Sequence, residues 1–349
     1  MSYKTTSNCL KASTVALLML FFQPLVAQKN FNGLTQQLTE QQKNFGNDFA
    51  VLLATPDTIV YQKEFGAMKV KTVAPIASAS KWLTAALVLQ FVDEGKLSLD
   101  DKVAKYLPVF EKYGKNYITI RHCLSHLTGI KSEGSILERL RERRKYNTLD
   151  EEVAAFAAHE IKTNPGTAFE YNEIGLNIAA RVLEVVSKKR FDMLIKQKLF
   201  NPLGMRQTTF TATDGSAPNP SGGARSTAMD YMAFLKMLLN NGKHNGQQIL
   251  SEASIAELRK IQTANLPMND APKAAAGFQY ALGAWVLESN GGMATVLASP
   301  GLFGTWPAVD FCRKYAFLFF TKDLLGEQKR GVYEDLKKLT DTNFPNGCK

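Results

Sequence analysis

The order of hydrophobic patterns along the chain limits the available folds more than any other feature of the sequence. Strand-like segments occupy residues 49–66 and return only after about residue 270, whereas most patterns between about 80 and 260 are helical. Strands at both ends of a chain can share one sheet when the two ends meet. The order therefore predicts an α+β fold: one antiparallel sheet built from both chain ends, covered by terminal helices, with an inserted helical region.

Local signals support this division. Residues 49–66 are typical of two strands joined by a turn at 55–57, and a helix from about Ser80 to Glu94 ends at Gly95. Further helices are predicted at 33–45, 119–129, 149–160, 174–199, 227–242, 251–262 and 327–341, and further strands at 278–288, 293–299, 304–310 and 314–321. We expect one folding unit with a sheet lobe (about 28–75 and 270–349) and a helical lobe (about 76–269).

The first 27 residues are typical of a secretory signal peptide. Lys4 and Lys11 precede an apolar run at 12–22, and small residues lead to a predicted cleavage site after Ala27. The alternative is an uncleaved membrane anchor, for which the apolar run is short. We expect a periplasmic or secreted protein with no stable membrane association after cleavage.

The charge balance is basic, with a formal net charge of +10. Much of the excess lies in the segment "ERLRERRKY" at 138–146. A nucleic-acid or anionic-polymer surface is one interpretation. The interleaved acids Glu138 and Glu142 favour the other, a solvated helix face. We therefore expect no nucleic-acid partner, and an anionic envelope polymer remains an alternative.

The sequence offers no metal or cofactor motif. After signal removal three cysteines remain, which allow one disulfide at most, with Cys312 and Cys348 as the candidates. The four histidines lack metal-ligand spacing, since "HEIK" at 159–162 has no second histidine. We expect catalysis, if any, to need no cofactor.

One short motif can carry chemistry. Ser78-Ala79-Ser80-Lys81 is the only S-x-x-K in the chain. Residues three apart share a helix face, so Lys81 can reach the Ser78 hydroxyl, and a buried lysine can lose its proton near neutral pH. The alternative is a capping serine beside a solvated lysine. We interpret Ser80 as a capping or packing residue. A G-x-S-x-G nucleophile motif is absent.

Several segments together resemble one family. These are "SASKWLTAALVLQFVDEGKLSLDDKVAKYLP", "TIRHCLSHLTGI", "FEYNEIGLNIAARVLEVVSKK", "NPLGMRQTTF" and "GGARSTAMDYMAFLKMLLNNG". In this order they resemble the serine β-lactamase/DD-peptidase superfamily, in particular the branch of class C β-lactamases, family-VIII-type esterases and D-aminopeptidases. The resemblance covers nearly all of the mature chain. It implies a five-stranded antiparallel sheet flanked by helices, with the site between the sheet and a helical lobe.

The resemblance also implies roles for individual residues. Ser78 matches the acylated nucleophile, Lys81 its proton acceptor, and Tyr171 the tyrosine of the Y-x-N motif, which shares protons with the serine and the leaving group. Without the resemblance, Tyr171 would be interpreted as a core aromatic residue. The third motif matches Ser299-Pro300-Gly301, so the N–H groups of Ser78 and Leu302 are expected to bind the oxyanion.

Two positions depart from the family pattern. Glu173 replaces the asparagine of Y-x-N, and Ser299 replaces a lysine or histidine. An acid should repel a β-lactam carboxylate, so we expect an esterase or amidase acting on small neutral or cationic esters, amides or peptides. A β-lactamase or DD-carboxypeptidase is less favoured. Alternatively, Glu173 pairs with Lys81 and keeps it charged, or the chain is a non-hydrolytic binding protein.

Other side chains are interpreted as scaffold. His126 lies in a block that is structural in the resembled family, so it is left out of the candidate site. Trp285 and Trp306 lie in strand patterns and are expected to pack in the core rather than bind substrate.

Overall fold

The computed structural model describes residues 1–3, 29–134, 136–324 and 328–348. The chain divides into two compact units, Met1–Asn30 and Phe31–Lys349, and the fold described here is that of the second. Most of the expected signal peptide lies outside the described residues, so cleavage and export stay predictions. In the part of the chain that is described, no helix is long and apolar enough to cross a membrane.

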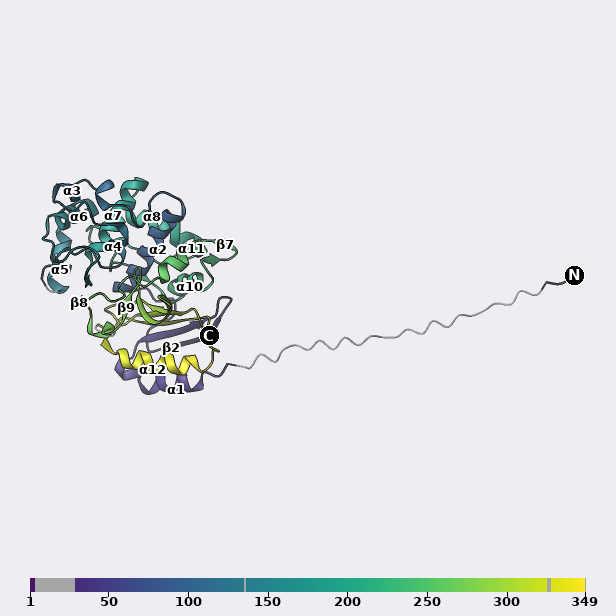
Figure 1. The fold of residues 1–349 in the computed structure, drawn as a ribbon. Helices are drawn as coiled ribbons and strands as arrows, with labels where there is room; N and C mark the ends of the chain where they lie inside the picture. The colour runs from purple at the N-terminus through teal and green to yellow at the C-terminus, as the bar shows by residue number, and fades with distance from the viewer. Residues whose placement is uncertain (4–28, 135, 325–327, 349) are drawn as a thin grey trace. The chain divides into compact units, whose positions relative to one another are not determined.

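A seven-stranded sheet forms the centre of the Phe31–Lys349 unit (Figure 1). Its strands run in the order β2-β1-β13-β12-β11-β10-β9, and every neighbouring pair is antiparallel. The bounds are β1 Phe49–Ala54, β2 Ile59–Phe65, β9 Gln279–Tyr280, β10 Trp285–Asn290, β11 Met293–Ala298, β12 Trp306–Asp310 and β13 Tyr315–Thr321. The antiparallel sheet built from both chain ends is confirmed. The predicted count of five strands is wrong, because β2 and β9 extend the two edges.

Alternating side chains of β1 bury both faces of this sheet. Val51 and Leu53 pack in one core with α1 (Asn32–Glu40) and α12 (Arg330–Asp341), which lie along the lower face in Figure 1. Ala50 and Leu52 pack in the larger core on the opposite face, with the inserted helices. Side chains alternate across a strand, so a central strand buried on both faces must be apolar throughout, as β1 is.

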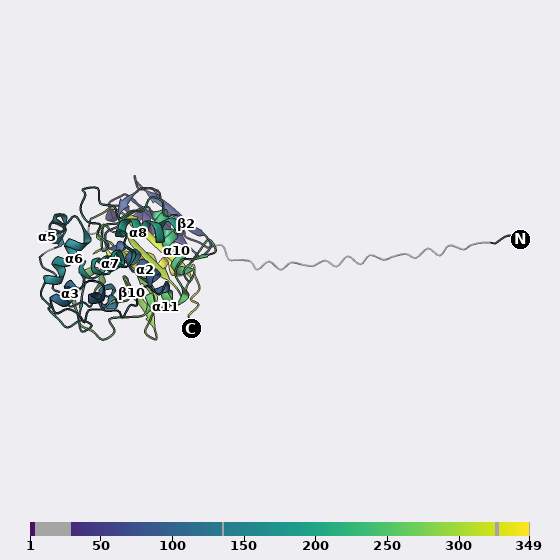
Figure 2. The ribbon, with the colours of Figure 1, turned by 90° about the horizontal axis from the view of Figure 1, so that it is seen from above.

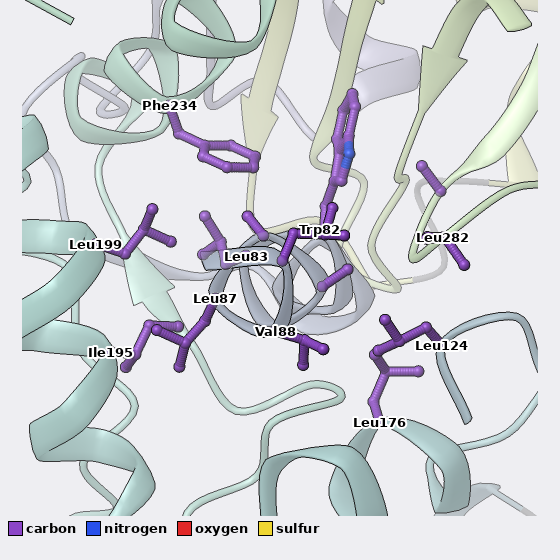
Figure 3. Packing of buried hydrophobic residues seen from close by; sticks show 14 of the residues in the cluster. Trp82, Leu83, Leu87, Val88, Leu124, Leu176, Ile195, Leu199, Phe234 and Leu282 are labelled. Carbon is purple, nitrogen blue, oxygen red and sulfur yellow. The ribbon is translucent and has the colours of Figure 1, made fainter. Parts of the chain in front are cut away.

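Helix α2 (Ser80–Asp93) is the centre of the larger core. Every residue from Ser80 to Phe91 is buried, which is typical of a helix surrounded by protein on all sides. Figure 3 shows its apolar side chains directed towards Leu124, Leu176 and Phe234, which belong to α4, α7 and α10. Packing on all sides fixes the helix start, where Ser78 and Lys81 lie.

The inserted helices surround α2 (Figure 2). They are α3 Val109–Lys112, α4 Ile120–Leu124, α5 Ile136–Glu142, α6 Leu149–Ala158, α7 Ile174–Ser187, α8 Phe191–Ile195, α9 Asn201–Leu203, α10 Ala228–Leu239 and α11 Glu252–Arg259. The single helix predicted at 174–199 is wrong. Lys188 adopts φ +56°, which ends α7, and the chain restarts as α8 followed by a π-helical turn at Lys196–Phe200.

Three small sheets tie loops to this frame. β3 (Ala74–Pro75) pairs with β5 (Arg225–Ser226), just before the Ser78 turn. β4 (Phe169–Glu170) pairs in parallel with β8 (Met268–Asp270), just before Tyr171. The third joins β6 (Lys243–His244) to β7 (Gln247–Gln248). The first two sheets hold the segments that enter the candidate site.

Candidate active site

Ser78 lies in a tight 3-10 turn, Ala77–Ala79, that leads directly into α2. Ala77 adopts φ +44°, a left-handed conformation that costs a residue with a Cβ atom of the order of 1 kcal/mol. The starts of the turn and of α2 have no side-chain capping hydrogen bond, so the interpretation of Ser78 as a capping residue is wrong. A strained turn with a half-buried serine that caps no helix is typical of functional sites.

Lys81 is the partner of that serine. Its Nζ lies 3.1 Å from Ser78 Oγ and donates a second hydrogen bond, of 2.9 Å, to the Ser221 carbonyl. The side chain is buried, and loss of hydration lowers the Lys81 pKa to about 7, against an attractive effect of Glu173. At neutral pH a large share of this amine is therefore uncharged and able to accept a proton.

The loop at 217–224 covers the start of α2. Besides the Lys81 contact, Thr84 Oγ1 donates to the Pro220 carbonyl at 2.7 Å, and Ser80 Oγ accepts from the Ala224 N–H at 3.0 Å. Ser80 therefore binds the covering loop rather than capping its own helix. Three α2 side chains thus hold one loop against the candidate nucleophile.

Tyr171 follows β4 and meets Lys81 from the other side. The Lys81 nitrogen lies 4.7 Å from the centroid of the Tyr171 ring. The ring itself packs against His126 and Trp285, with centroids 4.6 Å and 5.2 Å away. The structure thus brings together three of the predicted site residues: Ser78, Lys81 and Tyr171.

His126 is buried behind Tyr171 as a scaffold residue. Its Nδ1 accepts a hydrogen bond of 3.4 Å from the Asn172 N–H, so the ring proton of the neutral form lies on Nε2. Burial, and then the nearby Lys81, hold the His126 pKa well below its ordinary value. A neutral imidazole fixed in one tautomer orients the aromatic ring beside it, which agrees with its omission from the predicted site.

Glu173 has a different partner from the one considered in the sequence. Its Oε1 lies 3.1 Å from Nε of Arg139, a residue of α5, and Glu173 and Lys81 form no ion pair among the described residues. The alternative in which Glu173 pairs directly with Lys81 is therefore wrong. Arg139 also offsets the charge of Glu173, which removes much of the basis for expecting repulsion of a substrate carboxylate.

The basic segment at 138–146 is only partly solvated. Arg141, Glu142, Arg144 and Lys145 are exposed, as expected. Arg139 and Arg143, however, have side chains that are only 20% and 12% exposed and turn towards half-buried Glu173 and buried Glu152. The interpretation of the whole segment as a solvated face is wrong for these two residues.

The third motif lies beside the serine turn. Ser299 is buried, and its hydroxyl is 3.4 Å from the Ser78 carbonyl and 3.3 Å from the Gly283 carbonyl. At Gly301 a Cβ atom would lie 2.2 Å from the Ile76 carbonyl, so glycine is required for this close approach. Leu302 follows, half-buried, at the start of the turn between β11 and β12.

The two tryptophans and one cysteine pair match the sequence interpretation. Trp285 and Trp306 are buried, and Trp306 stacks on Tyr333 with ring centroids 4.5 Å apart. Cys312 and Cys348 form the predicted disulfide, and Cys123 is a buried free thiol. Among the residues that the structure describes, no three His, Cys, Asp or Glu side chains gather in a way that could hold a metal ion.

Sequence reasoning missed two groups at the site. Ser221 supplies its backbone carbonyl, and a backbone contact leaves no signal in the residue type. Arg139 belongs to a segment whose mixed charges are typical of a solvent-exposed helix, and only the packing of α5 reveals its inward direction. The Pro-Ser-Gly-Gly stretch at 220–223 indicated a loop, but it gave no sign that the loop contacts Lys81.

Comparison with known proteins identifies the family and supports the fold. The family model described as Beta-lactamase matches residues 31–341. A penicillin-binding protein 4 of Amycolatopsis lactamdurans is 30% identical over 214 residues, which are 52% of this chain and 55% of that protein. Protein flp of Staphylococcus aureus (strain MW2) is 32% identical over 142 residues, 40% of this chain and 28% of that protein. The matched regions thus span about half or less of these relatives.

Solved structures share the fold over most of the chain. A Bacteroides dorei DSM 17855 protein, provisionally described as a beta-lactamase, has a TM-score of 0.79 and 27% identity, with 90% of this chain and 99% of that chain covered. A family VIII carboxylesterase has a TM-score of 0.70 and 17% identity, covering 88% and 97%. The second likeness supports the fold alone. The family match over residues 31–341, on this sheet and this arrangement of helices, shows that the chain belongs to the Beta-lactamase family.

Proposed function

We propose that this protein is an exported serine hydrolase that cleaves an ester or amide bond through an acyl-enzyme on Ser78. The observation that carries the proposal is the pair formed by Ser78 Oγ and the buried Lys81 amine, 3.1 Å apart. The lowered pKa of about 7 gives that amine a free lone pair at neutral pH. Membership of the Beta-lactamase family, and the fold shared with a family VIII carboxylesterase, support hydrolysis as the general activity.

In the proposed first step, the Ser78 oxygen attacks the carbonyl carbon as its proton passes to neutral Lys81. One Lys81 proton stays with the Ser221 carbonyl, which keeps the lone pair directed at Ser78. The C–O bond to serine forms, and the carbonyl π-electrons move to the oxygen. Backbone N–H groups of Ser78 and Leu302 are the proposed donors to that oxyanion.

Collapse of this intermediate breaks the bond to the leaving group. Tyr171, whose ring lies 4.7 Å from the Lys81 nitrogen, is proposed to pass the proton from Lys81 to the departing oxygen or nitrogen. Water then attacks the acyl-enzyme, gives a proton to the same groups, and releases the acid and free Ser78. The two steps consume only substrate and water, and Ser78, Lys81 and Tyr171 return to their starting protonation states.

The substrate proposed is a small ester, amide or peptide. The neutralised Glu173–Arg139 pair at the site no longer argues for a cationic substrate in particular. Ser299, which contacts two backbone carbonyls, supplies no positive charge for a β-lactam carboxylate. Esterase or amidase activity is therefore favoured over β-lactamase activity, and faster hydrolysis of a cephalosporin than of short acyl esters would contradict that order.

The test is the intact mass of the purified mature protein after treatment with a fluorophosphonate, beside Ser78→Ala, with turnover of short p-nitrophenyl esters followed in parallel. We expect one adduct on the wild type, none on Ser78→Ala, and loss of ester turnover with the adduct. A folded wild type that forms no adduct and turns over no ester would instead support a non-hydrolytic binding protein. The same intact mass would show whether the signal peptide is cleaved after Ala27.

A further inference from the structure

A buried ion pair lies behind the covering loop and outside the catalytic residues proposed above. Arg143 follows α5, in the 3-10 turn Arg143–Lys145, and its Nη2 is 3.3 Å from Glu152 Oε2 of α6. The two side chains are 12% and 1% exposed. Burial raises the pKa of Glu152, against the attraction of Arg143. Such a pair is costly to desolvate and is weak evidence of stabilisation, so its presence calls for another explanation.

The same guanidinium holds the loop that covers Lys81. Arg143 Nη2 also donates to the carbonyls of Ala217 and Pro218, at 3.2 Å and 3.1 Å. The Ala217 N–H in turn donates to the Tyr146 carbonyl at 2.9 Å, so the chain just after Arg143 fixes the same point of the loop. Glu152 thereby fixes the direction of Arg143, and Arg143 fixes the loop at 217–218.

Three residues further on, the loop reaches the catalytic lysine. The Ser221 N–H donates to Asn177 Oδ1 at 3.1 Å, and Asn177 is a fully buried residue of α7. The Ser221 carbonyl then accepts the 2.9 Å hydrogen bond from Lys81. A continuous set of contacts thus runs from Glu152 through Arg143 and the loop to the nitrogen beside Ser78.

We propose that Arg143 and Glu152 are positioning residues for catalysis, which hold the loop at 217–221 so that the Ser221 carbonyl aligns Lys81 with Ser78. This inference rests on the proposed function. Asn177 binds the N–H of the same residue, Ser221, and so fixes the peptide just before this carbonyl. A misplacement of about 1 Å at a reacting group can cost about a hundredfold in rate. The clamp formed by Arg143 and Glu152 therefore affects catalysis by fixing the position of this carbonyl.

An unsatisfied atom of Arg143 agrees with a positioning role. Arg143 Nε is buried and has no hydrogen-bond partner among the described residues, whereas the Asn177 side chain adds a favourable interaction to the Glu152 carboxylate. A pair whose main role was stability would be expected to satisfy this atom. Here the Arg143 hydrogen bonds go to the two loop carbonyls and to one carboxylate oxygen.

Other groups also act on Lys81 and have to be separated from the clamp. Glu173 raises the Lys81 pKa and Arg139 lowers it, while the Tyr171 ring packs against the amine and neutral His126 lies behind that ring. Glu173 and Arg139 pair with each other, and His126 accepts from the Asn172 N–H, so these three have partners outside the loop at 217–221. The clamp can therefore be altered while they remain in place.

The experiment compares Arg143→Gln and Glu152→Gln with the wild type and with Arg144→Gln, an exposed neighbour on the same turn. We expect kcat for ester hydrolysis to fall between about ten- and a hundredfold in the two clamp variants, with KM within about threefold. The acid limb of kcat/KM should move to higher pH, because a displaced loop lets water reach Lys81 and favours its charged form. Arg144→Gln should match the wild type.

A double variant separates positioning from folding. Arg143→Met with Glu152→Leu replaces the buried pair by apolar side chains, a change that is often neutral or stabilising. We expect its thermal stability to match or exceed that of the wild type while kcat and the acid limb stay as in the single variants. Recovery of kcat and of the wild-type acid limb in the stable double variant would overturn the proposal, since the pair would then be only structural.

Hydrogen exchange of the backbone N–H groups at 217–224 tests the clamp by a measurement that does not depend on catalysis. The proposal expects faster exchange there in Arg143→Gln and unchanged exchange in Arg144→Gln. If the wild type forms no fluorophosphonate adduct, the proposed function fails whatever the exchange shows. An active wild type, with exchange and acid limb unaltered in Arg143→Gln, would overturn the clamp and leave the proposed function standing.

Discussion

The Lys81 amine lies 3.1 Å from Ser78 Oγ and is buried at the start of a helix that no side chain caps. In a helix start used only for stability, the serine oxygen would accept from a backbone N–H and the lysine would reach water. Here both polar groups are turned towards each other instead. The pair is thus arranged at a cost in stability, and that cost can be measured.

Replacement of Lys81 by methionine should stabilise the protein while abolishing ester turnover. The shift of the Lys81 pKa from 10.5 to about 7 corresponds to a cost of about 4 kcal/mol at pH 7. Methionine avoids it but leaves the Ser221 carbonyl without its donor, which costs about 1–3 kcal/mol. We expect the free energy of unfolding at pH 7 to rise by about 1–3 kcal/mol in urea denaturation.

The pH dependence gives the control for this prediction. The lysine is uncharged in the folded state above its pKa of about 7 and charged in the unfolded state up to about 10.5. The wild type therefore gains stability as pH rises from 7 towards 10.5, because the unfolded state binds more protons there. The cost of the buried lysine falls to about 2 kcal/mol at pH 9, so the advantage of Lys81→Met should fall by about 2 kcal/mol and nearly vanish there. An advantage that stays constant with pH would contradict a lowered pKa.

The Glu173–Arg139 pair should tune the pH at which the enzyme becomes active. The proposed mechanism requires neutral Lys81, so kcat/KM should rise through pH 7 as the amine loses its proton. Glu173 raises the Lys81 pKa and Arg139 lowers it. Glu173→Gln should therefore move the acid limb to lower pH and Arg139→Gln to higher pH, each by about 0.5–1 unit.

Two further variants test this assignment. The double variant Glu173→Gln with Arg139→Gln removes both charges, and its acid limb should return close to that of the wild type. Arg141→Gln, on the exposed side of the same helix, should leave the profile unchanged. If both single variants moved the acid limb in the same direction, the pair would act through the local structure rather than through its charges.

The sequence predicted the fold well because apolar periodicity records burial. The continuous apolar run of β1 and the long apolar stretch of α2 follow from residues such as Val51 and Leu83, whose type indicates burial. The S-x-x-K spacing likewise predicted that Lys81 reaches Ser78, since a helix turn fixes that distance. The break that divides the strand predicted at 278–288 into β9 and β10, and the break at Lys188, depend on tertiary packing and left no periodic signal.

The surroundings of the site were harder to predict for a different reason. The partners of Lys81 and Arg143 include backbone carbonyls of the 217–221 loop, and every residue type carries a carbonyl. Glu173 stands out as a departure from the resembled pattern, but its partner Arg139 lies 34 positions earlier, in a segment with many charges. Long-range pairs between charged residues are decided by packing, which composition does not encode.

The disulfide should stabilise the C-terminal part of the sheet without affecting catalysis. Cys312 lies just after β12, and Cys348 is 36 positions later, after α12. Closing a loop of this length restricts the unfolded chain, and its removal typically costs about 2–4 kcal/mol. We expect Cys348→Ser to lower the midpoint of thermal unfolding while kcat stays unchanged at 25 °C. Reduction of the wild type should give the same midpoint, and a lowered kcat would contradict a purely structural bridge.

Gly301→Ala should damage catalysis through the backbone alone. An added Cβ would lie 2.2 Å from the Ile76 carbonyl, two residues before Ser78, so either the third motif or the serine turn has to move. Both segments carry proposed oxyanion donors, and losing one such donor typically costs about a hundred- to a thousandfold in kcat. We expect a fall in kcat of at least about tenfold, with a loss of about 1–3 kcal/mol in stability from the steric conflict.

Gly331→Ala is the matched control for this change. Gly331 lies in α12, on the opposite side of the sheet, and an added Cβ there meets no atom within 4 Å. Alanine favours the helix by about 1 kcal/mol over glycine, so this variant should be slightly more stable and equally active. Fluorophosphonate labelling rates should follow kcat in both variants. A folded Gly301→Ala that labels at the wild-type rate would show that the third motif can move without disturbing the oxyanion site.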